Sequence, residues 1–337
     1  MIITKTPFRM SFFGGGTDMK EFYETYGGSV ISTTFDKYVY VTVRHLPRFF
    51  TYKNQVTYSK IERTRSADQI EHPMVRNAMK LLDMQELIIN YDADLPARTG
   101  LGSSSSFAVG LLNAFYCLKG KYADKHRLAD DAIYVERVMC DEAGGLQDQI
   151  AASFGGFNRI NFSSEGYEVR PVIISPERKQ KLNDNLMFFF TGFTRLSSEI
   201  QKDTKKNTGK NIDTLLKMKE QVDIAEQILV SKDRDLDDFG RLLNESWRLK
   251  RSTGNKVSTE AIDEIYQKAM DAGALGGKLL GAGGGGFIVF YVPENRQADV
   301  KKALNNLLYV PFRFENTGTE VIYYSPEQFN VEGDYDD

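Results

Sequence analysis

The chain has 337 residues, which is enough for two packed domains or one large one. Its hydrophobic content of 41% and charged content of 26% are ordinary for a globular protein, and a net charge of −3 argues against a binder of nucleic acid duplexes. Two cysteines make no disulfide framework, three histidines make no ligand-spaced cluster, and no apolar run is long enough to span a membrane. The N-terminus does not resemble a signal peptide. We therefore expect a cytoplasmic protein that binds neither nucleic acid nor a membrane, and the sequence indicates no oligomeric state.

The first half of the chain mixes predicted strands and helices. Alternating apolar residues and β-branched runs predict the strands, and apolar residues at helical spacing predict the helices. Gly144-Gly145 is expected to stop the second of these helices. The predicted elements are strands over 2–12, 29–44 and 157–162, and helices over 103–118, 125–141 and 146–154.

The pattern changes after about residue 172, where long polar-faced helices begin. The predicted elements are strands over 186–190, 287–292 and 320–324, and helices over 197–230, 235–250, 259–272 and 297–308. No regular βαβ rhythm is present, so we predict an α+β protein with one domain over 1–172 and a second over 173–337. We interpret Lys202, Lys205, Lys206 and Lys210 as a solvated helix face and the acidic stretch 331–337 as a frayed end.

Three glycine-rich loops dominate the motifs, and the first runs from Pro7 to Asp18. Its glycines, Gly14, Gly15 and Gly16, follow a strand and allow the backbone to approach another group closely. Thr17 and Asp18 then supply polar side chains. The alternative is a tight turn in which Asp18 caps a helix.

The second loop leads directly into a predicted helix. It reads Leu95-Pro96-Ala97-Arg98-Thr99-Gly100-Leu101-Gly102-Ser103-Ser104-Ser105-Ser106. A glycine loop that feeds a helix start places unpaired N–H groups at the positive end of the helix dipole, and the serines add hydroxyls. This arrangement favours a phosphate site over a simple serine cap.

The third loop, Lys278 to Phe287, contains Gly281, Gly283, Gly284 and Gly286 and satisfies GxGxxG. A dinucleotide fingerprint should open a helix, whereas the apolar run from Phe287 predicts a strand, so we reject an NAD-dependent dehydrogenase. No P-loop motif is present. We expect this loop, with Gly283 and Gly284, to approach the phosphate site from the second domain.

Two carboxylates between the second and third loops also call for an explanation. Glu136 falls beside the apolar stripe of its predicted helix, where a carboxylate should be paired or bound to a metal. Asp148 opens the short helix after Gly144-Gly145. The alternatives are an exposed Glu at the edge of the stripe and an Asp that compensates the helix dipole.

The three loops, in this order and with these carboxylates, resemble the GHMP small-molecule kinases, named after galactokinase, homoserine kinase, mevalonate kinase and phosphomevalonate kinase. The resemblance covers about residues 5–290. It implies an N-terminal domain like the second domain of ribosomal protein S5, a ferredoxin-like C-terminal domain, and ATP with Mg²⁺ between them. The phosphates of ATP would lie on the second loop.

The same resemblance implies roles for individual residues. Ser104 and Glu136 match the Mg²⁺ ligands, and Asp148 matches the aspartate that accepts the proton of the substrate hydroxyl. Arg9 matches the cation that assists the nucleophile in galactokinases. Asp18 matches the aspartate that holds sugar hydroxyls, with Gly15, Gly16 and Thr17 beside it where galactokinases carry Glu-His-Thr.

Within the family, three segments are similar to bacterial D-glycero-D-manno-heptose 7-phosphate kinases and to the kinase part of fucokinases. They are 12–18, 36–39 and 247–252. The first group would phosphorylate the anomeric hydroxyl to give heptose 1,7-bisphosphate for nucleotide-activated heptose and surface polysaccharide, with Arg195, Lys250 and Arg251 available for the distal phosphate. The alternatives are a fucokinase-like or other sugar-1-kinase and a non-catalytic sugar sensor.

Overall fold

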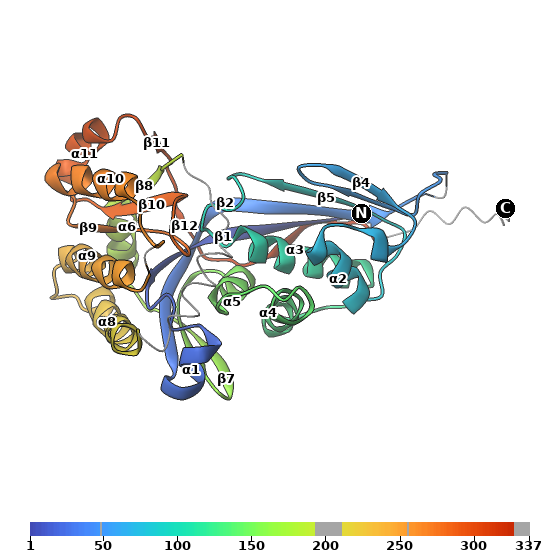
Figure 1. Cartoon of the computed structure of the whole chain (residues 1–337), viewed down its shortest axis with the longest axis horizontal. Helices are drawn as coiled ribbons and strands as arrows, with labels where there is room; N and C mark the ends of the chain where they lie inside the picture. Colours follow the sequence, from blue (N-terminus) through green and yellow to red (C-terminus); the bar gives the residue numbers. More distant parts are fainter. Residues whose placement is uncertain (48, 193–210, 255, 327–337) are drawn as a thin grey trace.

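The computed structural model describes residues 1–47, 49–192, 211–254 and 256–326. These residues form two separate β-sheets with helices packed on them, which confirms the predicted α+β fold (Figure 1). The predicted helix start at 197, the lysines at 202, 205, 206 and 210, Arg195 and the stretch 331–337 lie outside the described residues.

The larger sheet is built around one long strand, β2 (Gly28–His45). It pairs antiparallel with β1, β5, β6 and β12. Among the described residues the strands follow the order β13-β1-β2-β5-β3-β4, with β6 and β12 on β2 and β7 on β6. The other bounds are β1 (Ile2–Phe13), β3 (Asn54–Thr57), β4 (Ile61–Thr64), β5 (Leu87–Ala93), β6 (Phe157–Ser163), β7 (Gly166–Pro171), β12 (Phe314–Glu315) and β13 (Glu320–Tyr324).

Helix α3 (Ser103–Leu118) packs on β1 and β2 and is buried over almost its whole length, because it also contacts α4 and α5. At its middle, Gly110 lets the helix approach β1, since a Cβ there would lie 2.7 Å from Thr6 Oγ1. The remaining helices of this part are α1 (Lys20–Tyr26), α2 (Pro73–Leu81), α4 (Lys125–Ile133) and α5 (Gln147–Phe154).

The helix predicted over 125–141 is α-helical only as far as Ile133. The chain then widens into a π-helical turn over Tyr134–Met139, in which the N–H of Cys140 donates to Val135 O at 2.8 Å. Single π-turns of this kind occur often at functional sites. Here the turn carries Glu136.

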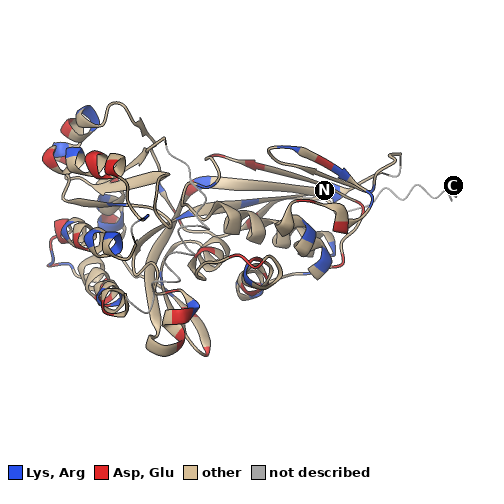
Figure 2. Cartoon of the chain, viewed as in Figure 1, with Lys and Arg blue, Asp and Glu red and all other residues tan. Residues whose placement is uncertain are grey.

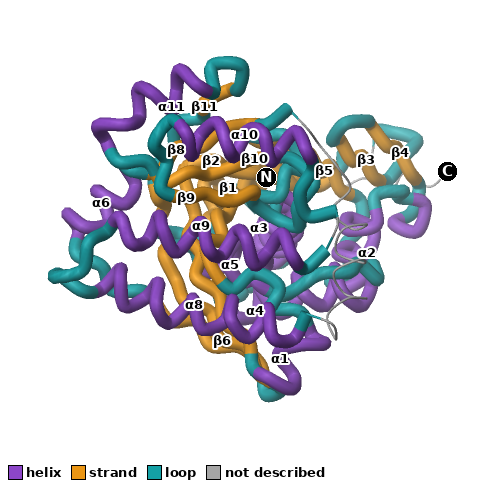
Figure 3. The backbone as a smooth tube through the Cα atoms, turned by 60° about the vertical axis from the view of Figure 1, so that its left-hand side comes forward, coloured by secondary structure: helices purple, strands orange, loops and turns teal. Residues whose placement is uncertain are grey.

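The smaller sheet has the strand order β11-β8-β10-β9. A second apolar core of the molecule lies at this sheet and contains Trp247. Figure 3 shows α9 and α8 side by side on the flank of this region. The bounds are β8 (Leu186–Phe190), β9 (Gly276–Leu279), β10 (Phe287–Tyr291), β11 (Leu308–Tyr309), α6 (Pro176–Asp184), α8 (Ile212–Val230), α9 (Asp237–Ser252), α10 (Glu260–Asp271) and α11 (Gln297–Ala303).

The C-terminal strands do not stay with the smaller sheet. Strand β12 pairs with β2, and β13 pairs with β1, so residues 314–324 belong to the larger sheet. The chain therefore crosses between the two sheets twice, and a single division at residue 172 does not describe where β12 and β13 pack. The division stays a prediction for the residues between 172 and 313.

Figure 2 shows Lys and Arg mixed with Asp and Glu over the outer helices α8 to α11. In the part of the chain that the structure describes, no helix combines the length and apolar character needed to cross a membrane.

Candidate functional site

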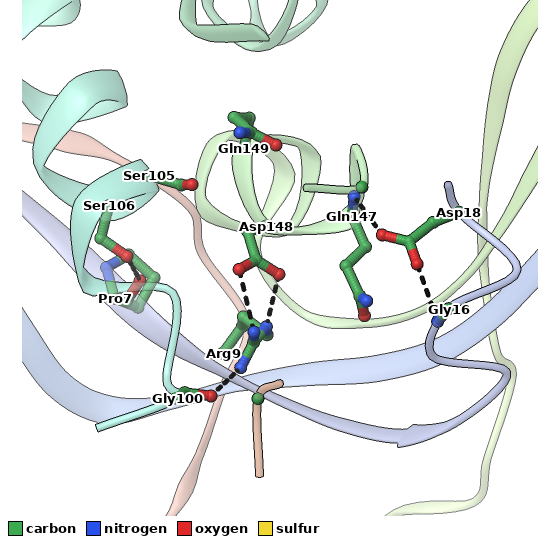
Figure 4. Close-up of polar contacts among 12 residues, drawn as sticks. Pro7, Arg9, Gly16, Asp18, Gly100, Ser105, Ser106, Gln147, Asp148 and Gln149 are labelled. Carbon is green, nitrogen blue, oxygen red and sulfur yellow. Dashed lines mark hydrogen bonds and ion pairs between the residues drawn. The ribbon is translucent and has the colours of Figure 1, made fainter. Parts of the chain in front are cut away.

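The centre of the site is an ion pair between Arg9 on β1 and Asp148 in the first turn of α5 (Figure 4). Arg9 Nε donates to Asp148 Oδ1 at 2.8 Å and Nη2 donates to Oδ2 at 2.9 Å, so the contact is bidentate. Arg9 Nη1 donates to Gly100 O at 2.6 Å. Arg9 is 4% exposed, and a buried guanidinium with a bidentate carboxylate is held in one orientation. The pair therefore fixes Asp148 beside the second glycine loop.

Asp18 lies on the other side of Gln147 from Asp148, as Figure 4 shows. Its Oδ1 accepts from the N–H of Gly16 at 3.0 Å and its Oδ2 accepts from the N–H of Gln147 at 3.3 Å. Gly145 is required here because a Cβ would overlap Oδ2 of Asp18. Burial raises the pKa of the Asp18 carboxyl, and the nearby charge of Asp148 adds to the rise.

The second loop ends at the N-terminus of α3, as the sequence predicts. Gly102 precedes the helix in the left-handed conformation with φ of 76°, and no side chain caps the helix. The first hydrogen bond of the helix runs from the N–H of Ser106 to Gly102 O at 2.8 Å. The N–H groups of Ser103, Ser104 and Ser105 precede that bond, so the helix end offers them, with its positive dipole, to an anion.

Glu136 lies next to this helix end and is 1% exposed. Its Oε2 accepts from Ser105 Oγ at 2.8 Å and from Gln149 Nε2. Ser104, which the resemblance pairs with Glu136, lies one residue earlier in the same turn with an exposed side chain, and among the described residues no hydrogen bond joins it to Glu136. The structure therefore brings Ser105, rather than Ser104, to the carboxylate.

The oxygen groups beside Glu136 fit a hard divalent cation. A carboxylate, serine hydroxyls and Gln149 Oε1, which is buried without a hydrogen-bond partner, are the ligand types that Mg²⁺ prefers. Among the described residues no group of three or more His, Cys, Asp or Glu side chains is placed to hold a metal. A cation at Glu136 would thus be completed by hydroxyls and by ligands from outside the chain.

The third loop packs directly on the second, backbone against backbone. A Cβ on Gly281 would overlap Gly100, and a Cβ on Gly286 would overlap the main chain of Thr99. Gly281 and Gly286 both have positive φ, which fits only glycine well. Strand β10 begins at Phe287, so the GxGxxG pattern opens a strand and not a helix. The loop, which joins β9 to β10 of the smaller sheet, therefore holds the second loop in place.

Gly283 and Gly284 occupy the tip of this third loop. A Cβ on Gly283 would lie 2.5 Å from Val257 O, and the N–H of Gly284 donates to the same oxygen at 3.0 Å. The loop is thus tied to the segment that follows α9. The structure uses these two glycines for that contact, and a role in holding nucleotide stays a prediction.

Two lysines from the second part of the chain complete the site. Lys250 at the end of α9 donates from Nζ to Gly281 O, and Lys278 on β9 donates to Phe12 O at 2.8 Å. Burial and the positive charge of Arg9 lower the pKa of Lys250 to about 8, against the opposing pull of the site carboxylates. Burial, with Lys250 and Arg9, holds the pKa of Lys278 well below its ordinary value.

One pocket collects most of these groups. The residues that line it are Arg9, Ser11, Gly15, Gly16, Asp18, Met19, Arg137, Gly145, Gln147, Asp148, Leu215, Lys250, Thr253, Val257, Lys278, Gly281 and Ala282. Ser11 Oγ and Gln147 Oε1 are buried there without a hydrogen-bond partner. Unpaired polar atoms in a pocket are costly unless a ligand satisfies them, which favours a hydroxyl-rich ligand.

Two predicted residues lie elsewhere. Thr17 is fully buried, and its hydroxyl lies 2.8 and 2.9 Å from Gly14 O and Ser29 O, one of which takes its proton. The hydroxyl oxygen also accepts from the N–H of Ser29, so Thr17 ties the first loop to β2 and does not face the pocket. Pro96 is exposed at the start of the second loop, where its carbonyl accepts from Thr99 Oγ1. Each supports the shape of its loop.

Other pocket residues escaped the sequence analysis. Lys278 is adjacent to the third glycine loop, but nothing in a single sequence shows that its side chain turns toward β1. Arg137 directly follows Glu136 in the π-helical turn, which helical periodicity does not reveal. Arg251 does not reach the pocket, because it pairs with Asp263 at the surface, whereas Lys250 does.

Comparison with known proteins bears on what this pocket does. A family model described as GHMP kinases N terminal domain matches residues 58–156, and one described as GHMP kinases C terminal matches residues 210–310. Together they cover more than half of the chain and contain the second loop, Glu136, Asp148, Lys250 and the third loop.

Individual relatives extend the match to nearly the whole chain. A D-glycero-alpha-D-manno-heptose 7-phosphate kinase of Campylobacter jejuni is 28% identical over 90% of this chain and 93% of its own. A solved structure from Bacteroides thetaiotaomicron, described as a D-glycero-D-manno-heptose 1-phosphate kinase, has a TM-score of 0.79 and 25% identity over 96% of this chain and 100% of its own. A bifunctional fucokinase/GDP-fucose pyrophosphorylase of Arabidopsis thaliana is 26% identical over 64% of this chain and 21% of its own.

Proposed function

The chain belongs to the GHMP kinase family and is a phosphotransferase with a hydroxyl acceptor, and from this premise we propose that it phosphorylates the anomeric hydroxyl of D-glycero-D-manno-heptose 7-phosphate with ATP and Mg²⁺. The product is the 1,7-bisphosphate, a precursor of nucleotide-activated heptose for surface polysaccharide. The observation that carries the proposal is the pocket in which Asp148 and Asp18 lie among Arg9, Lys250 and Lys278, next to the uncapped start of α3.

The start of α3 supports an ATP site. Its N–H groups, the left-handed turn at Gly102 and the hydroxyls of Ser103 and Ser104 suit the phosphates. We assign Glu136 and Ser104 as the residues that hold Mg²⁺, with Ser105 orienting the carboxylate through its hydrogen bond. A bound Mg²⁺ would neutralise negative charge on the phosphoryl group that is transferred.

Asp148 and Arg9 act on the acceptor. Both oxygens of Asp148 accept from Arg9, yet each carboxylate oxygen keeps a lone pair for the incoming hydroxyl. Asp148 orients that hydroxyl and takes its proton as the new O–P bond forms and the bond from the γ-phosphorus to ADP breaks, while Arg9 stabilises the negative charge on the attacking oxygen. Lys250 adds a further positive charge from the second part of the chain, beside Arg9 and Gly281.

Asp18 sets the orientation of the sugar. Its carboxylate is held by two backbone N–H groups, so its remaining acceptor positions face the pocket, where Ser11 Oγ and Gln147 Oε1 also lack partners. These groups suit neighbouring sugar hydroxyls, which donate and accept together. Gly15 and Gly16 add no side chain to this wall, which leaves room for a long sugar.

A coupled ADP-release assay tests the assignment. It compares heptose 7-phosphate, the free heptose, mannose, fucose and galactose as acceptors. We expect heptose 7-phosphate to be best, with kcat/KM for the free heptose lower by about ten- to a hundredfold, since a charge-assisted phosphate contact is lost. If fucose or another unphosphorylated sugar is turned over best, the heptose assignment is wrong and a sugar kinase of another specificity remains.

A further inference from the structure

The proposed acceptor carries a phosphate, and a second arginine of the pocket has no assigned partner. Arg137 lines the same pocket as Asp18 and Asp148. Its Nε and Nη2 donate to Gly145 O at 3.2 and 2.9 Å, and its Nη1 donates to Glu142 O at 3.4 Å. Across the described residues no carboxylate lies within ion-pair distance of this guanidinium. The guanidinium therefore donates to two main-chain carbonyls, and its nearest electrostatic partner is the Glu142 carboxylate, whose pKa its charge lowers against the larger raising effect of burial.

The hydrogen bonds of Arg137 leave donors available. They use the Nε proton and one proton on each terminal nitrogen, so a second proton on Nη1 and on Nη2 has no partner among the described residues. One free N–H on each of the two terminal nitrogens can donate to two oxygens of a phosphate. The contacts to Gly145 and Glu142 hold the group in place, so little side-chain entropy is lost on binding.

The position of Arg137 places it at the acceptor end of the pocket. Gly145 lies between it and Asp18, because Gly145 O accepts from Arg137 while a Cβ on Gly145 would overlap the Asp18 carboxylate. Asp148, by contrast, is on the side of the second loop, where a Cβ on Gly102 would lie 3.5 Å from its Cγ. The order along the pocket is thus Gly102, Asp148, Asp18 and then Arg137.

That order matches the order of groups along a sugar that carries a distal phosphate. If the reacting hydroxyl meets Asp148 and the next hydroxyls meet Asp18, the far end of the molecule extends toward Arg137. Lys250 is less suited to this end, because its Nζ contacts Gly281, which packs on Gly100 next to the phosphate loop. Lys250 therefore belongs with the group that is transferred.

The π-helical turn explains how one segment serves both ends. Glu136 and Arg137 are consecutive, yet Glu136 reaches Ser105 at the start of α3 while Arg137 reaches Gly145. The wide turn between Tyr134 and Met139 delivers a carboxylate to the phosphate-donor side and a cation to the acceptor side. A change in this turn would affect both.

We propose that Arg137 binds the phosphate group at the far end of the acceptor and so determines that the enzyme prefers a phosphorylated sugar. The inference rests on the proposed function, since it names the residue that recognises the 7-phosphate. It makes Arg137 a specificity-determining residue whose loss is felt only by substrates that carry the distal phosphate.

The test compares kcat/KM for heptose 7-phosphate and for the free heptose in wild type, Arg137→Gln and Arg137→Lys. We expect Arg137→Gln to lower the ratio of kcat/KM for heptose 7-phosphate to kcat/KM for the free heptose by about ten- to a hundredfold. Arg137→Lys keeps the charge but loses the paired donors of the guanidinium, so its ratio should lie between those of wild type and Arg137→Gln. The matched control is Arg251→Gln, at a surface arginine that pairs with Asp263, and it should keep the wild-type ratio.

The outcomes separate the inference from the function it rests on. A merely structural role for Arg137 lowers activity on both sugars alike, so an unchanged ratio in Arg137→Gln overturns the inference. A raised KM for ATP with an unchanged ratio also overturns it and places Arg137 at the nucleotide. If the wild type itself shows no preference for the phosphorylated heptose, the proposed acceptor is wrong, and the inference about Arg137 is overturned with it. Where Arg137→Gln does not fold, Arg137→Lys gives the same ratio test.

Discussion

Lys250 offers a prediction in which stability and catalysis move in opposite directions. Its pKa is lowered from 10.5 to about 8, mainly by burial. At a pH where Lys250 is protonated in both the folded and the unfolded chain, its charge therefore lowers the free energy of unfolding. Lowering the pKa from 10.5 to about 8 reduces the free energy of unfolding by about 3 kcal/mol at pH values below 8. Between pH 8 and 10.5 the unfolded chain still holds the Lys250 proton that the folded chain has lost, so the free energy of unfolding rises with pH in this range.

Replacing Lys250 with Met removes the partly buried charge but leaves Gly281 O without its donor, a loss of about 1–2 kcal/mol. We therefore expect Lys250→Met to raise the free energy of unfolding at pH 7 by about 1–2 kcal/mol, and this difference from wild type to shrink by about 2 kcal/mol at pH 9.5. The kcat should fall by about 10²–10³-fold, because the cation beside the transferred group is gone. Urea unfolding of the ligand-free protein at both pH values and the ADP-release assay measure these effects.

Exposed Lys268 on α10 is the matched control, and Lys268→Met should change neither quantity. The reasoning fails if Lys250→Met is destabilised by more than about 1 kcal/mol at pH 7, or if its difference from wild type does not shrink as the pH rises. Either result would show that Lys250 does not lower the free energy of unfolding while it supports catalysis.

Other changes test the loops and the metal residues. Glu136→Gln should raise the Mg²⁺ concentration needed for half-maximal activity at least tenfold in a folded protein, and near-normal activity at limiting Mg²⁺ would remove Glu136 from the metal site. Ser104→Ala should weaken Mg²⁺ activation without altering stability, since its side chain is exposed. Ser105→Ala should also lower the free energy of unfolding by about 1 kcal/mol, because the Glu136 carboxylate loses a donor. Equal stability of the two variants in urea would contradict this. Gly281→Ala should destabilise the protein by at least about 1 kcal/mol and abolish most activity, because the methyl group would overlap Gly100 at a positive φ; a variant as stable as wild type would show that the loops are not locked together.

Local chemistry made much of the fold and site predictable. The second loop and α3 follow from glycine conformational freedom, helix dipole and apolar spacing, all of which act over a few residues. Strands β6, β8 and β10 were predicted within a residue or two for the same reason. The short strands β3, β4 and β9 were missed, because four residues carry too little periodicity to be distinguished from loops.

Long-range contacts could not be predicted from the sequence. The lock between Gly100 and Gly281, and the overlap that Gly145 avoids with Asp18, join residues far apart in the chain. The pairing of β13 with β1 is likewise invisible to local patterns. Which serine faces Glu136 depends on the rotation of α3 about its axis, which is set by packing on β1 and β2 and not by the loop itself.

The central claim is that Asp148, held by Arg9 beside the start of α3, activates the acceptor hydroxyl for phosphoryl transfer. Single-turnover transfer from ATP to heptose 7-phosphate in Asp148→Asn, measured beside the Kd for ATP, tests it most directly. A general base contributes about 10²–10⁴-fold in rate, so the rate should fall by that order while the Kd for ATP stays within about threefold. A fall of less than about tenfold in a folded variant would show that Asp148 only begins helix α5, and the chemistry would have to be placed elsewhere.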